Sequence, residues 1–227
     1  MTKQEPNRDR SFKIKLKKSR GRTTSSRHWL ERQLNDPYVA AAKRDGYRSR
    51  AAYKLEEIAD KYGLLRPGDV VVDLGAAPGG WSQIAAKRVG AVDGKGKVVA
   101  IDLLEMPEIP GVQFAQLDFL DVAAPEKLIA MLGGRADAVL SDMAANTTGH
   151  RKTDQLRIVA LVEAAALFAS EVLKPGGTFL AKVFQSGADA DLLAQLKRDY
   201  ATVRHVKPAS SRQDSSERYV LATGFRG

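Results

Sequence analysis

Short apolar runs alternate with longer amphipathic stretches along most of the chain. The apolar runs are bounded by glycine, proline or polar residues, which is the pattern of buried strands, whereas apolar residues three and four apart indicate helices. On this basis we expect strands at residues 70–74, 97–102, 112–117, 136–141, 177–184, 202–206 and 218–225, and helices at 51–62, 80–89, 124–132, 154–173 and 188–199. This alternation predicts an α/β fold in which helices cover both faces of a mostly parallel sheet.

The connection between the last two predicted strands is a loop without room for a crossover helix. Because parallel neighbours need such a crossover, we expect the last strand, 218–225, to run antiparallel to its neighbours. The sequence contains no internal repeat and no sign of a second folded domain.

Positive charge is concentrated at the N-terminus. The chain of 227 residues has a formal net charge of +9. Residues 1–50 contain 15 Lys and Arg against 5 Asp and Glu, and the other 177 residues contain 21 against 22. Residues 1–25 have too little apolar surface to fold alone, so we expect a basic, disordered arm followed by one domain at 26–227. Such an arm is typical of proteins that bind nucleic acid, although a solubilising tail has the same composition.

The composition also narrows the function classes. The absence of cysteine excludes disulfides, thiolate catalysis and Cys-ligated metals. His28, His150 and His205 lack metal-ligand spacing, so we predict no metal site. The N-terminus is polar through Arg22, and charged residues interrupt the longest apolar stretch, 158–173. We therefore expect a cytoplasmic protein without a secretory signal or membrane partner, and a monomer.

The first predicted strand runs into a turn with the sequence Gly-Ala-Ala-Pro-Gly-Gly-Trp. Gly75, Gly79 and Gly80 would let the backbone approach a ligand, and Pro78 has the fixed φ that suits a first helical turn. Ligands of α/β sheets bind beyond the carboxyl ends of strands, so this turn is a candidate cofactor loop. Its spacing differs from the Gly-x-Gly-x-x-Gly of dinucleotide binders, which favours a cofactor without a pyrophosphate. The alternatives are a tight turn that binds nothing and, for Trp81, core packing beside the loop.

Three carboxylates follow the ends of predicted strands. Asp102 lies 27 residues after Gly75, where a carboxylate can accept hydrogen bonds from both hydroxyls of a ribose. Asp118 can accept from an adenine amino group, and the neighbouring Phe119 can pack on the base. Asp142 follows the fourth strand. Helix capping is the alternative for each carboxylate, but together with the glycine turn they favour an adenosine-containing cofactor.

Several short motifs recur in order along the chain: Gly-Ala-Ala-Pro-Gly-Gly-Trp-Ser at 75–82, Ser-Asp-Met-Ala at 141–144, Leu-Lys-Pro-Gly-Gly at 173–177, Lys-Val-Phe-Gln at 182–185 and Lys-Pro-x-Ser-Ser-Arg at 207–212. In these motifs the chain resembles the FtsJ group of RNA ribose 2′-O-methyltransferases, from about Arg27 to Gly227. The resemblance implies S-adenosylmethionine as methyl donor and a Rossmann-like methyltransferase fold, with a seven-stranded sheet whose last strand is antiparallel. The residues that we expect to contact the cofactor are Gly75, Pro78, Gly79, Gly80, Trp81, Asp102, Asp118, Phe119 and Asp142.

The resemblance also implies a catalytic tetrad of Lys54, Asp142, Lys182 and Glu217. Topology supports three of these residues independently, because the ends of the strands that carry Asp142, Lys182 and Glu217 should meet at the edge of the sheet that holds the glycine turn. A lysine inside an apolar strand also requires an explanation, since lysine is rarely buried without a partner. The alternative for these three residues is a structural ion pair, and Lys54 rests on the resemblance alone.

The implied reaction is in-line attack of a ribose hydroxyl on a sulfonium methyl group, in which orientation supplies much of the acceleration. Lys182 would act either as the base or as a charged group that orients the hydroxyl. Lys54 and desolvation favour the neutral form of Lys182, whereas Asp142 and Glu217 favour the charged form. The sequence leaves this balance open.

The stretch at residues 25–39 resembles the bacterial large-subunit rRNA members of the group. We therefore expect methylation of a uridine ribose in large-subunit rRNA, with a ribosomal particle such as the 50S subunit as the substrate. The alternatives are a tRNA or mRNA-cap 2′-O-methyltransferase and a ribosome-assembly factor with residual catalysis, whereas the loop spacing disfavours an NAD-dependent enzyme. The Ser-Ser-Arg segment at 210–212 is either an RNA phosphate contact or a plain polar loop.

Overall fold

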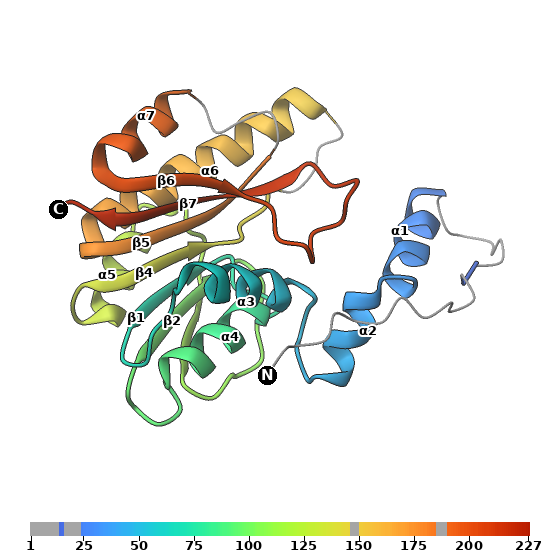
Figure 1. Cartoon of the computed structure of the whole chain (residues 1–227), viewed down its shortest axis with the longest axis horizontal. Helices are drawn as coiled ribbons and strands as arrows, with labels where there is room; N and C mark the ends of the chain where they lie inside the picture. The colour runs from blue at the N-terminus through green and yellow to red at the C-terminus, as the bar shows by residue number, and fades with distance from the viewer. Residues whose placement is uncertain (1–13, 16–23, 146–149, 185–189) are drawn as a thin grey trace.

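A seven-stranded sheet forms the centre of the fold (Figure 1). The computed structural model describes residues 14–15, 24–145, 150–184 and 190–227. The strands follow the order β3-β2-β1-β4-β5-β7-β6 across the sheet, and β7 is antiparallel to both β5 and β6, as predicted. The strands are β1 Val70–Leu74, β2 Lys97–Asp102, β3 Val112–Gln116, β4 Ala136–Ser141, β5 Leu173–Phe184, β6 Tyr200–Val206 and β7 Glu217–Phe225.

Helices cover both faces of the sheet, and their bounds follow the apolar pattern closely. The helices are α1 Thr24–Leu34, α2 Pro37–Arg44, α3 Ala51–Tyr62, α4 Gly80–Val89, α5 Ala124–Leu132, α6 Arg151–Val172 and α7 Ala190–Asp199. The strand expected at 177–184 begins earlier, because Leu173 already pairs with Ala136 of β4, before a register irregularity. The helices α1 and α2 were not predicted, although Asp36 and Pro37 carry a helix-start signal: Asp36 accepts a hydrogen bond from the amide of Tyr38 at 3.0 Å.

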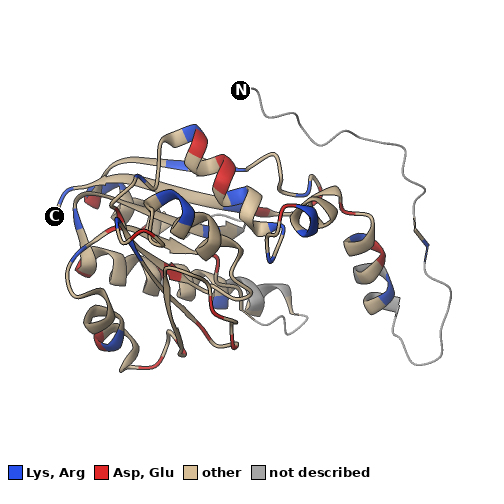
Figure 2. Ribbon diagram, turned by 90° about the horizontal axis from the view of Figure 1, so that it is seen from below, with Lys and Arg blue, Asp and Glu red and all other residues tan. Residues whose placement is uncertain are grey.

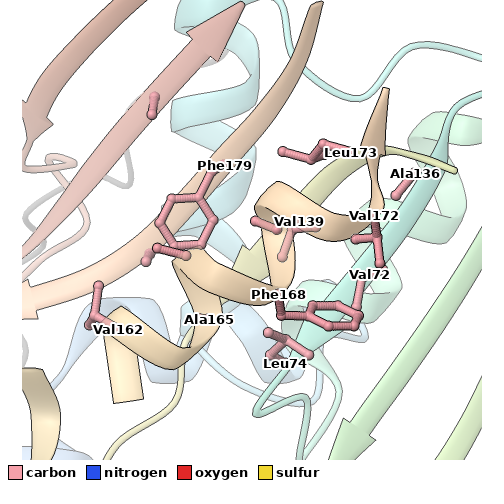
Figure 3. Packing of buried hydrophobic residues seen from close by; sticks show 14 of the residues in the cluster. Val72, Leu74, Ala136, Val139, Val162, Ala165, Phe168, Val172, Leu173 and Phe179 are labelled. Atoms are coloured by element: carbon pink, nitrogen blue, oxygen red, sulfur yellow. The ribbon is translucent and has the colours of Figure 1, made fainter. Parts of the chain in front are cut away.

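Alternate residues of the central strands enter two separate cores. Val72 of β1 and Phe179 of β5 pack against α5, α6 and α7, and Figure 3 shows them together with Phe168 of α6. Val71 of β1 and Leu180 of β5 face the other way and pack against α3 and α4. Burying each large apolar side chain contributes about 1.5–3 kcal/mol, so both layers hold the sheet rigidly. The carboxyl ends of the parallel strands are therefore a fixed platform for a site.

The helices α1 and α2 lie at one end of the molecule, away from the sheet (Figures 1 and 2). They are tied back through Asp36, which forms ion pairs with Arg50 and with Arg212 in the loop after β6. Most of the predicted basic arm, 1–25, lies outside the described residues, and α1 already begins at Thr24. Within the described part of the chain, no helix has the length and apolar composition of a membrane span.

Candidate active site

The glycine turn connects β1 to α4 at the carboxyl edge of the sheet. Gly75 has φ +78°, and a Cβ there would lie 2.8 Å from the Cα of Met143 in the loop after β4. Gly79 has φ +111° and is the N-cap of α4, which begins at Gly80. The helix therefore begins at residue 80 as predicted, and Pro78 lies in the turn before the N-cap, outside the first helical turn that its fixed φ would also suit. Contact with a neighbouring protein segment therefore already requires glycine at Gly75, in addition to any close approach of a ligand.

Asp102 and Asp118 hold the loops that follow β2 and β3. Asp102 accepts hydrogen bonds from the amide of Ala77 at 2.9 Å and from the amide of Leu104 at 2.8 Å, so it ties its own loop to the glycine turn. Asp118 is exposed and accepts from the amide of Leu120 at 2.9 Å. A carboxylate has about four acceptor positions, so both residues keep capacity for hydroxyl or amino donors.

Two aromatic residues expected at the cofactor are buried in the core. The Phe119 ring is 9% exposed and meets Phe168 of α6 edge-on, with 5.8 Å between ring centroids. Trp81 is 2% exposed and packs against Tyr219 in a tilted arrangement, with 5.6 Å between ring centroids. Its indole N–H donates to the carbonyl of Ala51 at 2.9 Å. These contacts give both rings a packing role beside the loops, and a cofactor contact for either residue stays a prediction.

Asp73 was missed by the sequence reasoning, although a charged residue within Val-Val-Val-Asp-Leu is itself a signal. It is fully buried, its Oδ2 accepts a hydrogen bond from Ser82 at 2.6 Å, and its Oδ1 has no partner. Burial, and then the negative charges of Asp142 and Asp102, raise the pKa of Asp73 to about 7, against the opposing effect of the Ser82 hydrogen bond. A buried acceptor without a partner beside the glycine turn suits a ligand that carries positive charge or donor groups.

The four residues of the expected tetrad form two ion pairs at this edge. The Nζ of Lys182 donates to the backbone carbonyl of Asp142 at 2.5 Å and lies 3.1 Å from its Oδ1. The Nζ of Lys54, on α3, lies 2.5 Å from Oε1 of Glu217 at the start of β7. Lys182 is only 8% exposed, so the buried lysine expected in this strand is present and is paired.

Tyr219 connects the two ion pairs and was also missed. Its hydroxyl lies 3.3 Å from Oδ1 of Asp142 and 3.2 Å from Oε1 of Glu217, and it has one proton to donate. Burial, followed by the charges of both carboxylates, raises the pKa of Tyr219 well above its ordinary value, so the phenol is neutral. Strand periodicity offers a signal for Tyr219, because residues two apart in β7 point to the same face.

Glu217 keeps its negative charge despite its burial. Desolvation raises the pKa of its carboxyl, but the adjacent Lys54 ammonium, with smaller effects from Lys182 and Tyr219, outweighs burial and lowers that pKa below the ordinary value. The site thus places a charged carboxylate next to a lysine on α3. Such an arrangement of oriented charges can hold and polarise a hydroxyl group.

A sequence model of the FtsJ-like methyltransferases matches residues 47–225. The chain belongs to this family. Two proteins named ribosomal RNA large subunit methyltransferase E are similar to it: that of Nitrobacter hamburgensis is 79% identical and covers 95% of each chain, and that of Bradyrhizobium diazoefficiens is 80% identical and covers 94% of each. A crystal structure from Plasmodium falciparum, assigned as a ribosomal RNA methyltransferase, is 30% identical with a TM-score of 0.70 and covers 80% of this chain and 100% of that chain.

Membership of the family confirms the Rossmann-like methyltransferase fold and the methyltransferase class. S-adenosylmethionine is accordingly the cofactor, and the site fits it in two respects. The unpaired Oδ1 of Asp73 suits a cationic ligand, and Asp102 and Asp118 hold free acceptor positions at neighbouring strand ends. When bound, the cofactor supplies the methyl group.

The remaining candidates have ordinary structural places. His150 is the exposed N-cap residue of α6, and His205 is exposed on β6. Over the described ranges, no group of His, Asp and Glu side chains could hold a metal ion. Arg212, a possible phosphate contact by sequence, has its Nη2 2.9 Å from Oδ2 of Asp36.

Proposed function

We propose that this methyltransferase transfers a methyl group from S-adenosylmethionine to the 2′-hydroxyl of a uridine in large-subunit ribosomal RNA. The observation that carries the proposal is the pair of lysine–carboxylate contacts, Lys182 with Asp142 and Lys54 with Glu217, at the edge of the sheet that bears the glycine turn. The names of the similar proteins support rRNA as the substrate class.

Lys182 is the group that we assign to the reacting hydroxyl. Two oxygen atoms of Asp142 lie within 3.1 Å of its Nζ, so the side chain is held in one position at the edge of the sheet. We therefore assign Lys182 the role of an orienting cation that holds the hydroxyl in line. The bound cofactor would supply the methyl group, and its sulfonium S–C bond would break as the new O–C bond forms, leaving a neutral thioether. The hydroxyl proton would become acidic and pass to the Asp142 carboxylate or to water.

Lys54 and Glu217 complete the environment of the hydroxyl. The Lys54 ammonium lies 5.9 Å from the centroid of the Tyr219 ring, and Tyr219 lies against both carboxylates. We assign Lys54 to hold negative charge on the substrate near the reacting atom and Glu217 to fix the position of Lys54. Orienting groups of this kind avoid the cost of reorganisation during the reaction.

The N-terminal basic residues supply the contact with RNA in this proposal. Residues 1–50 carry a net charge of +10, from 15 basic and 5 acidic residues, and the described part of this segment includes α1 and α2. Lysine and arginine that neutralise phosphates release counterions, so binding should weaken steeply with salt. A folded ribosomal particle offers such phosphates around the target, and we propose the large subunit as the substrate form.

Single-turnover methyl transfer to separate substrates tests the proposal. The wild-type protein is mixed with labelled S-adenosylmethionine and either free large-subunit rRNA, purified 50S particles, tRNA or capped mRNA, and the product is mapped for protection of one 2′-hydroxyl. We expect transfer to a uridine of large-subunit rRNA, fastest on the particle. Transfer to tRNA or cap alone would refute the substrate, and tight particle binding without transfer would favour an assembly factor.

A further inference from the structure

Arg48 spans two loops at the cofactor edge of the sheet. Its Nη1 donates to the carbonyl of Pro107 at 2.5 Å and to the carbonyl of Pro78 at 3.4 Å, and its Nη2 donates to the carbonyl of Glu108 at 2.6 Å. Pro78 belongs to the glycine turn, and Pro107 and Glu108 belong to the segment after β2. One guanidinium thus bridges the two loops that border the proposed cofactor pocket.

We propose that Arg48 is a positioning residue for the S-adenosylmethionine pocket and not a contact for RNA phosphate. The proposal rests on the cofactor assignment and deepens it, because it names the residue that fixes the shape of the pocket. Sequence alone points the other way, since Arg48 lies in the basic N-terminal fifty residues where phosphate contacts are expected.

The segment after β2 packs directly on the glycine turn. Met106 and Ile109 are 5% and 8% exposed and share a small apolar cluster with Ala76. A Cβ at Gly79 would lie 2.6 Å from Cδ1 of Ile109, 3.0 Å from Sδ of Met106 and 3.1 Å from Cδ of Arg48. The absence of a side chain at Gly79 is therefore what allows the segment, and the stem of Arg48, to approach the turn.

The guanidinium fork matches this position better than an ammonium would. Arginine presents its donors in a rigid plane, so it can bridge carbonyl groups of two segments at once, whereas lysine is a point charge on a flexible stem. Both donors of Nη1 and one donor of Nη2 are directed at protein carbonyls, so three of the five guanidinium donors are already used within the protein. The charge stays close to the turn, where it also favours an anionic group of a ligand.

Arg48 also links the cofactor loop to the helix that carries Lys54. The amide of Arg48 donates to Oε1 of Gln83 in α4 at 2.8 Å, and the side-chain amide of Gln83 donates to the carbonyl of Gly46 at 3.1 Å. Helix α3 begins three residues after Arg48, at Ala51. The hydrogen bonds of Arg48 and Gln83 thus connect the glycine turn to the segment just before α3.

Cofactor affinity measured without RNA is the direct test. Arg48→Met keeps the apolar stem and removes the fork, and Arg48→Lys keeps the charge. Arg44→Met is the matched control because the Arg44 side chain is 70% exposed and pairs with its neighbour Asp45. Titration calorimetry with S-adenosylmethionine and with S-adenosylhomocysteine gives Kd for each variant. Loss of charge-assisted hydrogen bonds should raise Kd about 10- to 100-fold in Arg48→Met, less in Arg48→Lys and not in Arg44→Met.

Two further readouts separate positioning from a general loss of structure and from RNA binding. In steady-state assays, KM for the cofactor should rise while kcat at saturating cofactor stays near the wild-type value. RNA affinity across a salt series, without cofactor, should keep its slope in Arg48→Met. An unchanged cofactor Kd with a shallower salt slope would overturn the proposal in favour of a phosphate contact, and a parallel loss of melting temperature and of both affinities would overturn it in favour of a structural role.

The outcome is independent of the proposed substrate. If wild-type protein binds the cofactor but methylates none of the tested RNAs, the proposed function fails while the calorimetric test of Arg48 still stands. If wild-type protein methylates rRNA and Arg48→Met binds the cofactor normally, only the inference about Arg48 fails.

Discussion

Replacing Asp73 by asparagine should remove a pH dependence from the stability of the fold. The carboxyl is fully buried and its pKa is raised from 3.8 to about 7, first by burial and then by the charges of Asp142 and Asp102. Between these two values the folded protein holds a proton that the unfolded chain has released. The raised pKa therefore stabilises the folded protein fully below pH 4, near the unfolded pKa. This stabilisation is lost as the pH rises from about 4 to 7.

The size of the effect follows from the two pKa values. When the pH rises from 5 to 7, the titration of Asp73 should lower the unfolding free energy of the wild-type protein by about 2 kcal/mol. Asp73→Asn lacks the titrating group, so its unfolding free energy should not show this decrease. The assay is urea unfolding of both proteins, without cofactor, at several pH values in this range. The buried amide of asparagine has unpaired donor and acceptor groups, which should lower the stability of the variant at every pH. The quantity to compare is therefore the slope of unfolding free energy against pH in the two proteins.

The charged groups distant from Asp73 are the same in both proteins, so their contributions cancel in this difference. Parallel pH profiles of wild type and Asp73→Asn would refute the reasoning, because they would mean that Asp73 is ionised in the folded protein throughout. Saturating S-adenosylmethionine should reduce the difference between the profiles, since a cation bound nearby favours the ionised carboxylate.

Three further predictions follow from the contacts at the site. Asp102→Ala should weaken S-adenosylmethionine binding by about 1–3 kcal/mol because polar groups lose a partner, and unchanged calorimetric affinity would place the cofactor elsewhere. Deleting residues 1–22, which leaves α1 intact, should flatten the salt dependence of RNA affinity without changing cofactor affinity, whereas an identical slope would indicate a solubilising tail. Tyr219→Phe should slow single-turnover methyl transfer by about 3- to 10-fold, as expected for the loss of one hydrogen bond to a carboxylate, and a wild-type rate would show that the two ion pairs need no bridge.

Periodicity was sufficient to locate the sheet and most of its helices. The strands in the centre of the sheet are mostly apolar runs, and a short loop was enough to predict the reversed direction of β7. Helix α1 was missed because its sequence is mostly polar, and α2 because its eight residues are too few for a long apolar stripe. The start of β5 was missed because it depends on pairing of Leu173 with Ala136, which no local pattern encodes.

The candidate site was predictable where a residue type is unusual for its position. Lys182 in an apolar strand and the glycines of the turn were found in this way, and the same reasoning could have found Asp73. Strand periodicity places Tyr219 on the same face as Glu217, but its contact with Asp142, 77 residues away, could not be found from the sequence. Arg48 could not be found either, because its partner Glu108 lies 60 residues away. The fixed φ of Pro78 suits both a turn and a first helical position, so that φ alone did not decide between them.

The central claim is that Lys182 acts on the reacting hydroxyl and is not merely half of a structural ion pair. The direct measurement is single-turnover methyl transfer to 50S particles at saturating cofactor by Lys182→Ala, with Lys174→Ala as the matched control. Lys174 lies in the same strand and pairs with Asp137 at 2.7 Å. We predict that Lys182→Ala slows transfer by at least about 10²-fold with cofactor affinity kept, while Lys174→Ala stays near the wild-type rate. A near wild-type rate in Lys182→Ala, or equal losses in both variants, would contradict the account.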